Sequence, residues 1–227
     1  MLARPLLLGH RGARATAKIV ENTSASFDKA IAHGCDGFEF DVRLTADHAA
    51  VLCHDATLSG LKISLTNRAE LPQLACLEDV VRRYHRRVFL DIELKVEGLE
   101  GIVLQALRDY PPERDYVVSS FLPQVVTELR ARSEGVQAGL ICEKRSQLMN
   151  WRTLPVDYVI VQQALVDGQL VQEIQSAGKK ILVWTVNEKH FMLQFARFGV
   201  DGIISDDTER LVRTLGKVDL GDDHSSM

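Results

Sequence analysis

Eight short apolar segments typical of β-strands recur along this 227-residue chain, and most of them are followed by an amphipathic segment typical of a helix. The expected strands cover residues 6–8, 37–44, 87–95, 116–120, 137–142, 158–161, 180–186 and 202–205. Eight strands in a chain of this length indicate a single TIM-type (β/α)8 barrel. An open, doubly wound α/β sheet is the alternative, but no Gly-x-Gly-x-x-Gly turn follows any expected strand.

The composition fits one folded domain. Hydrophobic residues make up 46% and charged residues 26% of the sequence, and no linker interrupts the alternation of strands and helices. We expect residues 1–215 to form the barrel. From residue 216 onward the apolar periodicity ends, so residues 216–227 are expected to be a disordered tail.

Charge, cysteine content and hydropathy narrow the partners and the location. The net charge of −4, without a local basic patch, argues against a nucleic-acid partner. No apolar run reaches the roughly 18 residues that a membrane span needs, and the apolar start is too short for a signal peptide. Four widely spaced cysteines favour a reducing compartment. We therefore expect a cytoplasmic protein, and the sequence predicts no oligomeric state.

The stretch 37–55 carries charge where a buried strand is expected. Glu39 and Asp41 are two residues apart, so both side chains leave the same face of the strand. A polar turn at residues 46–48 leads into a second apolar run, and the gap is too short for a helix. We interpret this as a small hairpin excursion after the second strand, which returns His54 to the level of the two carboxylates.

Unpaired carboxylates on one buried face require protonation, a cationic side chain or a metal ion. Asp91, Glu93 and Lys95 likewise fall on one side of their expected strand. The alternative is that Glu39 and Asp41 are ordinary surface carboxylates on the solvent-facing side of an edge strand. Lys95 would then pair with Asp91 or Glu93 on a surface face. In a barrel, the carboxyl ends of the strands meet at one mouth. That fold would gather there His10, Glu39, Asp41, Glu93, Lys95, Ser120 and Trp184.

The residues expected at the mouth suggest, first, that the site binds a metal ion and an anion. Glu39, Asp41 and Glu93 offer only hard oxygen ligands, which favours one divalent cation, Mg²⁺ or Ca²⁺, over zinc. Arg11 and Lys95 add two positive charges, which suit an anion such as phosphate.

Two histidines at the same mouth suggest, second, acid–base catalysis. His10 and His54 can exchange protons near neutral pH, one as a base and one as an acid. A metal ion, two cations and two histidines suit the cleavage of a phosphodiester. The alternative for each histidine is a purely structural role. Trp184 is either a core residue or part of the pocket wall.

Seven short motifs cover nearly the whole chain in a fixed order. They are Gly9-His10-Arg11-Gly12, Glu21-Asn22-Thr23, Phe38 to Val42, Val51 to Asp55, Ile92 to Lys95, Val183 to Asn187 and Gly199 to Ile204. This set resembles the glycerophosphodiester phosphodiesterases.

The resemblance implies a TIM-type barrel that hydrolyses glycerophosphodiesters to sn-glycerol 3-phosphate and an alcohol. In that family, the glycerol 2-hydroxyl is an expected nucleophile, which gives a cyclic phosphate that water then opens. The implied roles are metal binding for Glu39, Asp41 and Glu93, acid–base catalysis for His10 and His54, and binding of phosphoryl oxygens for Arg11 and Lys95.

Two departures from the family pattern bear on specificity. Val20 stands where the family usually has proline, and residues 59–65 replace an Arg-Thr-Thr-Asn-Gly stretch. We expect the excursion at residues 56–73 to wall the alcohol side of the pocket.

Apolar residues in this excursion leave a lysophospholipase D acting on lyso-lipids as an alternative: Leu58, Leu61, Ile63 and Leu65. A Mg²⁺-dependent enolising barrel with Lys95 as base, and a binding protein with a degenerate site, are the other readings.

Overall fold

Eight parallel strands close into a barrel in the computed structural model, which describes residues 4–216. The barrel closes because the first strand pairs with both the second and the last. Its strands are β1 (Leu6–His10), β2 (Gly37–Leu44), β6 (Phe89–Leu94), β7 (Tyr116–Ser120), β8 (Ala138–Cys142), β9 (Tyr158–Gln162), β10 (Lys180–Trp184) and β11 (Gly202–Ser205). The fold is the TIM-type barrel that the sequence predicts, and the expected tail lies outside the described residues from 217 onward.

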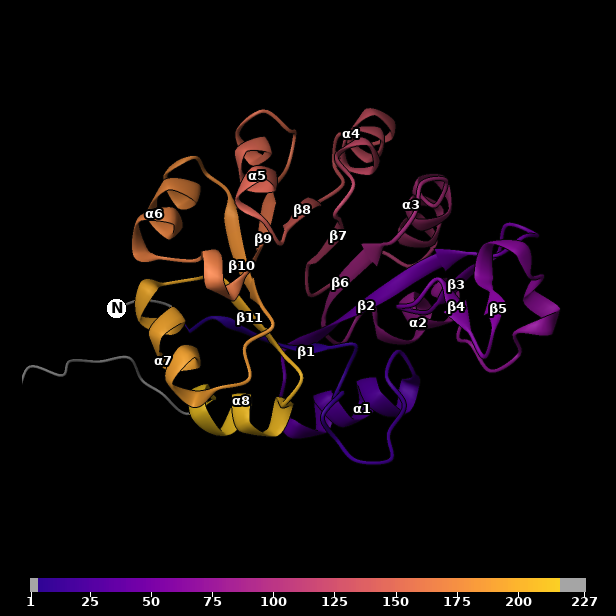
Figure 1. Cartoon of the computed structure of the whole chain (residues 1–227), viewed down its shortest axis with the longest axis horizontal. Helices are drawn as coiled ribbons and strands as arrows, with labels where there is room; N and C mark the ends of the chain where they lie inside the picture. The colour runs from indigo at the N-terminus through magenta and orange to yellow at the C-terminus, as the bar shows by residue number, and fades with distance from the viewer. Residues whose placement is uncertain (1–3, 217–227) are drawn as a thin grey trace, which may run out of the picture.

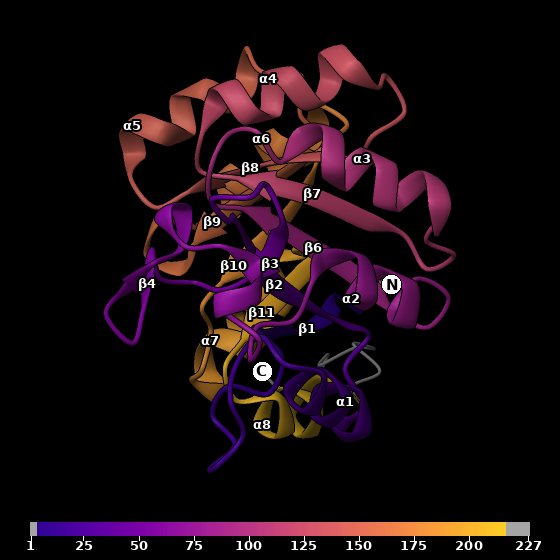
Figure 2. The same ribbon diagram turned by 90° about the vertical axis from the view of Figure 1, so that its right-hand side faces the viewer.

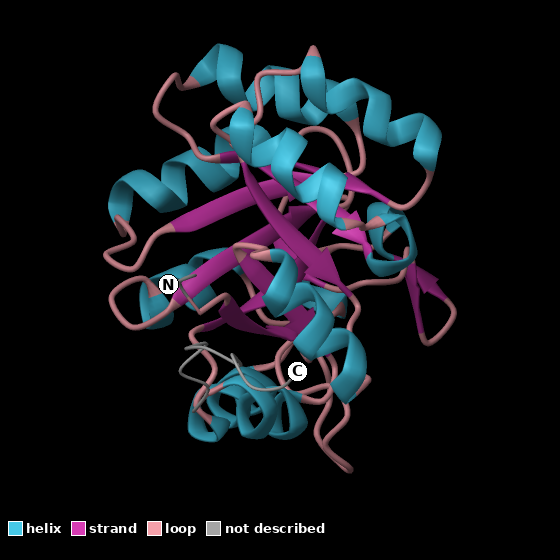
Figure 3. Ribbon diagram, turned by 90° about the vertical axis from the view of Figure 1, so that its left-hand side faces the viewer, coloured by secondary structure: helices cyan, strands magenta, loops and turns pink. Residues whose placement is uncertain are grey.

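Helices surround the strands on the outside of the ring (Figures 1 and 3). They are α1 (Ser24–His33), α2 (Leu77–Tyr84), α3 (Glu100–Asp109), α4 (Pro123–Arg132), α5 (Arg145–Leu148), α6 (Gly168–Ser176), α7 (Lys189–Phe198) and α8 (Thr208–Leu215). Short 3-10 turns lie at Met149–Arg152 and Gln163–Leu165. None of the helices in residues 4–216 is long and apolar enough to cross a membrane.

Local sequence signals set the ends of α1. The Thr23 hydroxyl accepts a hydrogen bond from the Ser26 backbone N–H and caps the first turn. Gly34 ends the helix with a φ of 102°, a left-handed conformation that glycine adopts without a side-chain penalty.

The excursion after β2 lies beside the barrel rather than in its wall (Figures 1 and 2). It contains β3 (Ala50–Leu52), antiparallel to β2, the small hairpin of β4 (Thr57–Leu58) and β5 (Leu61–Lys62), and 3-10 turns at Ile63–Leu65 and Arg68–Glu70. Ile63 and Leu71 are buried against Val51 and Cys53, so the excursion has a small core of its own.

Apolar side chains fill the barrel interior below its mouth. Leu8, Phe89, Val117, Tyr158 and Leu182 belong to one buried cluster that the strands share. Larger clusters lie between the strands and the helices, so the sheet is covered on both faces. This packing leaves the carboxyl ends of the strands as the place for polar side chains.

Candidate active site

One cavity of about 190 Å³ opens at the carboxyl ends of the barrel strands. Thirteen residues line it: His10, Arg11, Glu39, His54, Asp91, Glu93, Lys95, Phe121, Ile141, Glu143, Ile160, Trp184 and Ile204. Seven of the eight site residues expected from the sequence are in this lining. The eighth, Asp41, lies just behind it and is only 1% exposed.

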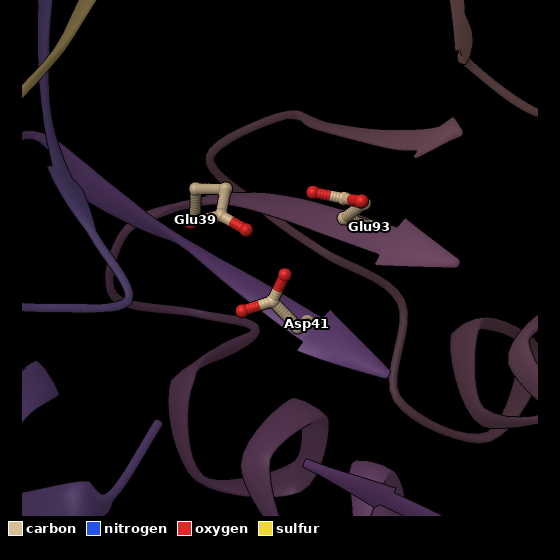
Figure 4. A group of neighbouring side chains, drawn as sticks. All are labelled: Glu39, Asp41 and Glu93. Carbon is tan, nitrogen blue, oxygen red and sulfur yellow. The ribbon is translucent and has the colours of Figure 1, made fainter. Parts of the chain in front are cut away.

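Strand register brings three carboxylates together. Asp41 on β2 pairs with Glu93 on β6, and Glu39 precedes Asp41 by two residues on the same face. One oxygen from each of these three residues lies within 4.8 Å of the others. Figure 4 shows the three side chains pointing toward one another from the two strands.

The turn after β1 holds the β2 carboxylates in place. The Arg11 backbone N–H donates to Glu39 Oε2 at 3.0 Å, and Asn22 Nδ2 donates to Asp41 Oδ2 at 2.9 Å. Arg11 and Asn22 have φ values of 54° and 56°, in the left-handed region that non-glycine residues rarely adopt. These strained positions therefore orient two of the three carboxylates.

Two cations neutralise part of this acidic cluster. Lys95 Nζ lies 2.6 Å from Glu93 Oε1 and 3.3 Å from Asp41 Oδ1. Arg11 Nε lies 3.2 Å from Asp41 Oδ2, while its Nη1 donates to Glu21 at 2.9 Å. Both cations thus border the cavity with part of their donor capacity already used.

Negative charge still exceeds positive charge at this site. Burial, with Asp41 and Glu93 close by, raises the pKa of Glu39 well above its usual value, and burial and Asp41 raise the pKa of Glu93 to about 7. Burial opposes ionisation of Asp41 as well, but Lys95 and Arg11 hold its pKa below the usual value. Glu39 Oε1 is buried without a hydrogen-bond partner in the described part of the chain. This cluster of hard, under-neutralised oxygen atoms fits a divalent cation.

His10 is held by a carboxylate from the far end of the chain. Its Nδ1 lies 2.7 Å from Asp206 Oδ1, and its Nε2 lies 3.8 Å from Glu39 Oε2. Burial alone would raise the pKa of Asp206, but the bonds from His10 and Asn187 and the charge of Arg14 keep it below the usual range. An ionised carboxylate only accepts hydrogen bonds, so Nδ1 carries the proton and Nε2 faces the cavity.

His54 reaches the cavity from the excursion. Its backbone carbonyl accepts hydrogen bonds from Arg43 at 2.8 and 2.6 Å, and its Nδ1 pairs with Asp55 Oδ1 at 2.7 Å. Partial burial lowers the pKa of the imidazole, against the opposing pull of Asp41 and Asp55. The return strand thus brings His54 beside the carboxylates, as the hairpin interpretation predicts.

The other half of the cavity is mainly apolar. Trp184 and Phe121 meet edge to face, with ring centroids 5.6 Å apart and planes at 80°. Three isoleucine side chains and Glu143 complete this side. Trp184 therefore lines the pocket rather than only filling the core.

Two positions differ from the sequence-based expectation. Ser120 does not line the cavity, because its hydroxyl is buried and donates to the Leu94 carbonyl at 2.7 Å. Residues 56–73 do not line it either, so the segment that follows His54 forms no wall of the cavity.

Three residues of the site have no role assigned from the sequence. Asp206 follows β11 and orients His10, although no local motif marks it. Asn22 supports Asp41 but reads in the sequence as part of a helix start. Asp91 was recognised as facing the same side as Glu93, without a role being assigned to it.

Comparisons with known proteins agree on one enzyme family. The model of the glycerophosphoryl diester phosphodiesterase family matches residues 10–210. A glycerophosphodiester phosphodiesterase of Caldanaerobacter subterraneus subsp. tengcongensis is 27% identical over 94% of this chain and 99% of its own length.

Solved structures of similar proteins share the fold of this chain. A phosphodiesterase from Oleispira antarctica, in complex with the product sn-glycerol-3-phosphate, is 26% identical, with a TM-score of 0.82 covering 94% of this chain and 98% of that one. A glycerophosphodiester phosphodiesterase from Parabacteroides distasonis shares the fold with a TM-score of 0.84 at 24% identity, covering 94% of this chain and 97% of that one.

Proposed function

Because the chain belongs to the glycerophosphoryl diester phosphodiesterase family and is therefore a phosphoric diester hydrolase, we propose that it hydrolyses glycerophosphodiesters to sn-glycerol 3-phosphate and an alcohol. The product seen in the Oleispira antarctica relative supports the first of these products. The observation that carries the proposal is one cavity lined by both expected histidines, two cations and the carboxylate cluster.

Glu39, Asp41 and Glu93 would hold one divalent cation, Mg²⁺ or Ca²⁺. Four buried carboxyl groups, these three and Asp91, lie close together with two permanently charged cations, Arg11 and Lys95, beside them, so a bound cation would stabilise their ionised forms. When bound, the ion supplies positive charge that stabilises the phosphoryl group in the transition state.

His10 and His54 act as the acid–base pair in this proposal. Each imidazole is fixed through Nδ1 by a carboxylate, Asp206 or Asp55, and each is left with Nε2 for proton exchange. One Nε2 takes the proton of the attacking hydroxyl, and the other delivers a proton to the departing alkoxide. The glycerol 2-hydroxyl is the proposed nucleophile, with water opening the cyclic phosphate afterwards.

Arg11 and Lys95 would bind the phosphoryl oxygens, and Trp184 would pack against the substrate at the same level. Lys95 Nζ is held at the edge of the cavity by Glu93 and lies 5.6 Å from the centre of the Phe121 ring. This position lets the ammonium group turn from the carboxylates to a bound phosphate.

The lining of the cavity favours a short diester over a lyso-lipid, because the apolar residues of the excursion that suggested an acyl-chain site are not part of it. In the excursion, Leu61 and Leu65 are 43% and 75% exposed but do not line the cavity. The lysophospholipase D reading therefore has no support from the cavity itself.

We propose that the protein is located in the cytoplasm, a reducing compartment, because of the state of its cysteines. All four are free, and burial raises the pKa of Cys35 and Cys142 to about 12, so neither thiol is reactive near neutral pH.

The test is the release of sn-glycerol 3-phosphate from glycerophosphocholine and glycerophosphoethanolamine by chelator-stripped protein, with and without Mg²⁺ or Ca²⁺. We expect release only after a divalent cation is returned. Release at full rate without metal would refute the metal site. No release with either ion, together with choline release from lysophosphatidylcholine, would replace the proposed substrate by a lyso-lipid.

A further inference from the structure

His54 lies on a segment with little regular structure to hold it. It is two residues beyond β3, residues 54–56 form a bend, and its side chain is 36% exposed. The partner of its Nδ1 is the neighbouring residue Asp55, whose side chain is 76% exposed. Exposed ion pairs of this kind contribute little, because solvent screens them and both side chains lose rotational freedom. The contact with Asp55 is therefore a weak anchor for the imidazole.

Arg43 supplies a stronger anchor through the backbone of His54. Its Nε and Nη2 both donate to the His54 carbonyl oxygen, at 2.8 and 2.6 Å. The guanidinium is partly buried, and hydrogen bonds from a charged donor are about twice as strong as those between neutral groups. Two bonds from one planar group to one oxygen also fix a direction, which the single rotatable ammonium of a lysine does not.

This anchor comes from the same strand face as two of the carboxylates. Arg43 follows Asp41 by two residues on β2, and Asp41 follows Glu39 by two, so all three side chains leave one face. Figure 4 shows Glu39 and Asp41 on this strand. Next to Arg43, β2 pairs with β6 on one side and with β3 on the other, where Arg43 is level with Val51. A strand held on both sides can set the distance between the imidazole and the carboxylates.

Attachment of the excursion to the barrel does not by itself explain these two bonds. The Cys53 backbone N–H donates to the Asp41 carbonyl at 3.1 Å, and the Leu52 N–H donates to the Ala75 carbonyl at 2.9 Å. The Cys53 side chain is also buried in the small core of the excursion. What Arg43 adds is a hold on His54, the one residue within 45–76 that lines the cavity.

We propose that Arg43 is a positioning residue that holds the His54 imidazole at its working distance from the carboxylate cluster. Arg43 is outside the cavity lining, so it acts through the backbone of His54 and not on the substrate. The inference rests on the proposed function and deepens it, because it ties one acid–base group to the strand that carries two of the expected metal ligands.

The test replaces Arg43 by alanine, which removes both bonds, and by lysine, which keeps the charge and one donor. With glycerophosphocholine and saturating Mg²⁺, we expect kcat to fall about 10- to 100-fold in Arg43→Ala and by less in Arg43→Lys, since a small displacement of a catalytic group costs up to about 10²-fold. KM and Mg²⁺ affinity should stay near their wild-type values, because substrate and metal contacts are untouched. If Arg43→Ala does not fold, Arg43→Lys carries the same comparison.

A double-mutant cycle separates positioning from a general structural role. In a His54→Ala background the imidazole is gone, so Arg43→Ala should lower the residual kcat no further. A further loss of kcat in that background would overturn the proposal, because Arg43 would then act on another part of the site. A loss of Mg²⁺ affinity in either Arg43 variant would overturn it for the same reason.

Arg68→Ala is the matched control within the excursion. Arg68 Nη1 and Nη2 donate to the carbonyl oxygens of Leu71 and Leu74 at 2.7 and 2.9 Å, so the same kind of bond is lost away from His54. This variant should lower the urea concentration at the midpoint of unfolding and leave kcat near the wild-type value. An equal loss of kcat in Arg68→Ala and Arg43→Ala would refute a specific role for Arg43, because a loosened excursion would then suffice.

Nuclear magnetic resonance of the imidazoles tests the position without turnover. Long-range ¹H–¹⁵N spectra cover the seven histidines, and His54→Ala assigns the His54 signals. In Arg43→Ala these signals should shift or broaden while those of His10 stay unchanged. Unmoved His54 signals, or wild-type kcat in both Arg43 variants, would overturn the proposal. Absence of glycerophosphocholine turnover in the wild-type protein would instead refute the proposed function, and the spectra would still decide the role of Arg43.

Discussion

Replacing Asp206 by alanine tests whether this carboxylate makes His10 competent for proton transfer. Asp206 Oδ1 accepts from His10 Nδ1 at 2.7 Å and from Arg14 at 3.3 Å, and Oδ2 accepts from Asn187 Nδ2 at 2.8 Å. In Asp206→Ala, nothing fixes the proton on Nδ1, so the ring no longer reliably offers Nε2 to the cavity.

The magnitude follows from the kind of bond that is lost. A hydrogen bond to a charged group contributes about 1.5–3 kcal/mol. At about 1.4 kcal/mol for each factor of ten in rate, we expect kcat to fall about 10- to 150-fold. Substrate and metal contacts are made by other residues, so KM and Mg²⁺ affinity should change little. Steady-state kinetics with glycerophosphocholine, over a range of Mg²⁺ concentrations, measure all three quantities.

Asp207→Ala is the matched control. Asp207 is the neighbouring carboxylate, but its Oδ1 accepts from the Arg210 backbone N–H at 2.9 Å and caps α8. Its loss should lower the free energy of unfolding by about 1 kcal/mol and leave kcat near the wild-type value. The reasoning is refuted if Asp206→Ala keeps kcat within about threefold of wild type, or if both variants lose kcat equally.

Three further predictions concern the same cavity. Glu39→Gln should weaken Mg²⁺ binding at least about tenfold in calorimetric titration, and unchanged affinity would remove Glu39 from the ligand set. His10→Ala and His54→Ala should each lower kcat by about 10²–10⁴-fold while inorganic phosphate still binds; near-normal turnover in either variant would contradict the acid–base assignment. The third is a pH dependence of stability in chelator-stripped protein, because burial raises the pKa of Glu93 from 4.5 to about 7. A raised folded-state pKa gives stability that is fully present below the unfolded pKa and lost as the pH rises through about 7. The urea concentration at the midpoint of unfolding should therefore decrease as the pH is raised from 5 to 8. Glu93→Gln should reduce this change without removing it, because burial also raises the pKa of Asp91 and Glu39; an equal slope in that variant would contradict the cause.

Periodicity predicted the fold because a barrel repeats one local unit. The apolar runs at 37–44 and 202–205 became strands, and Thr23 and Gly34 begin and end α1 as their chemistry requires. Because the carboxyl ends of barrel strands meet at one mouth, a residue at the end of a strand could be placed in space from its position in the sequence. That is why residues as distant as His10 and Trp184 were expected at one mouth and line one cavity. Their roles in the reaction stay predictions.

Three features were harder to predict: how deep in the barrel a residue lies, which face of its strand it occupies, and on which side of the barrel a loop packs. Ser119 pairs with Glu93 and faces inward, so Ser120, one residue on, faces the other way. Alternation showed the face on which Asp91 lies but not that it lines a cavity. The excursion has its own small core, and no periodic pattern indicates on which side of the barrel such a segment packs.

The hydrogen bond between His10 and Asp206 spans 196 positions of the chain, from the first strand to the residue after the last. This contact requires β11 to lie beside β1, and that pairing closes the ring of strands. Long-range pairing of this kind is slow to form during folding. Partly assembled barrels in a refolding experiment should therefore gain helical circular dichroism before they gain phosphodiesterase turnover, and the delay between the two signals would time the closing of the ring.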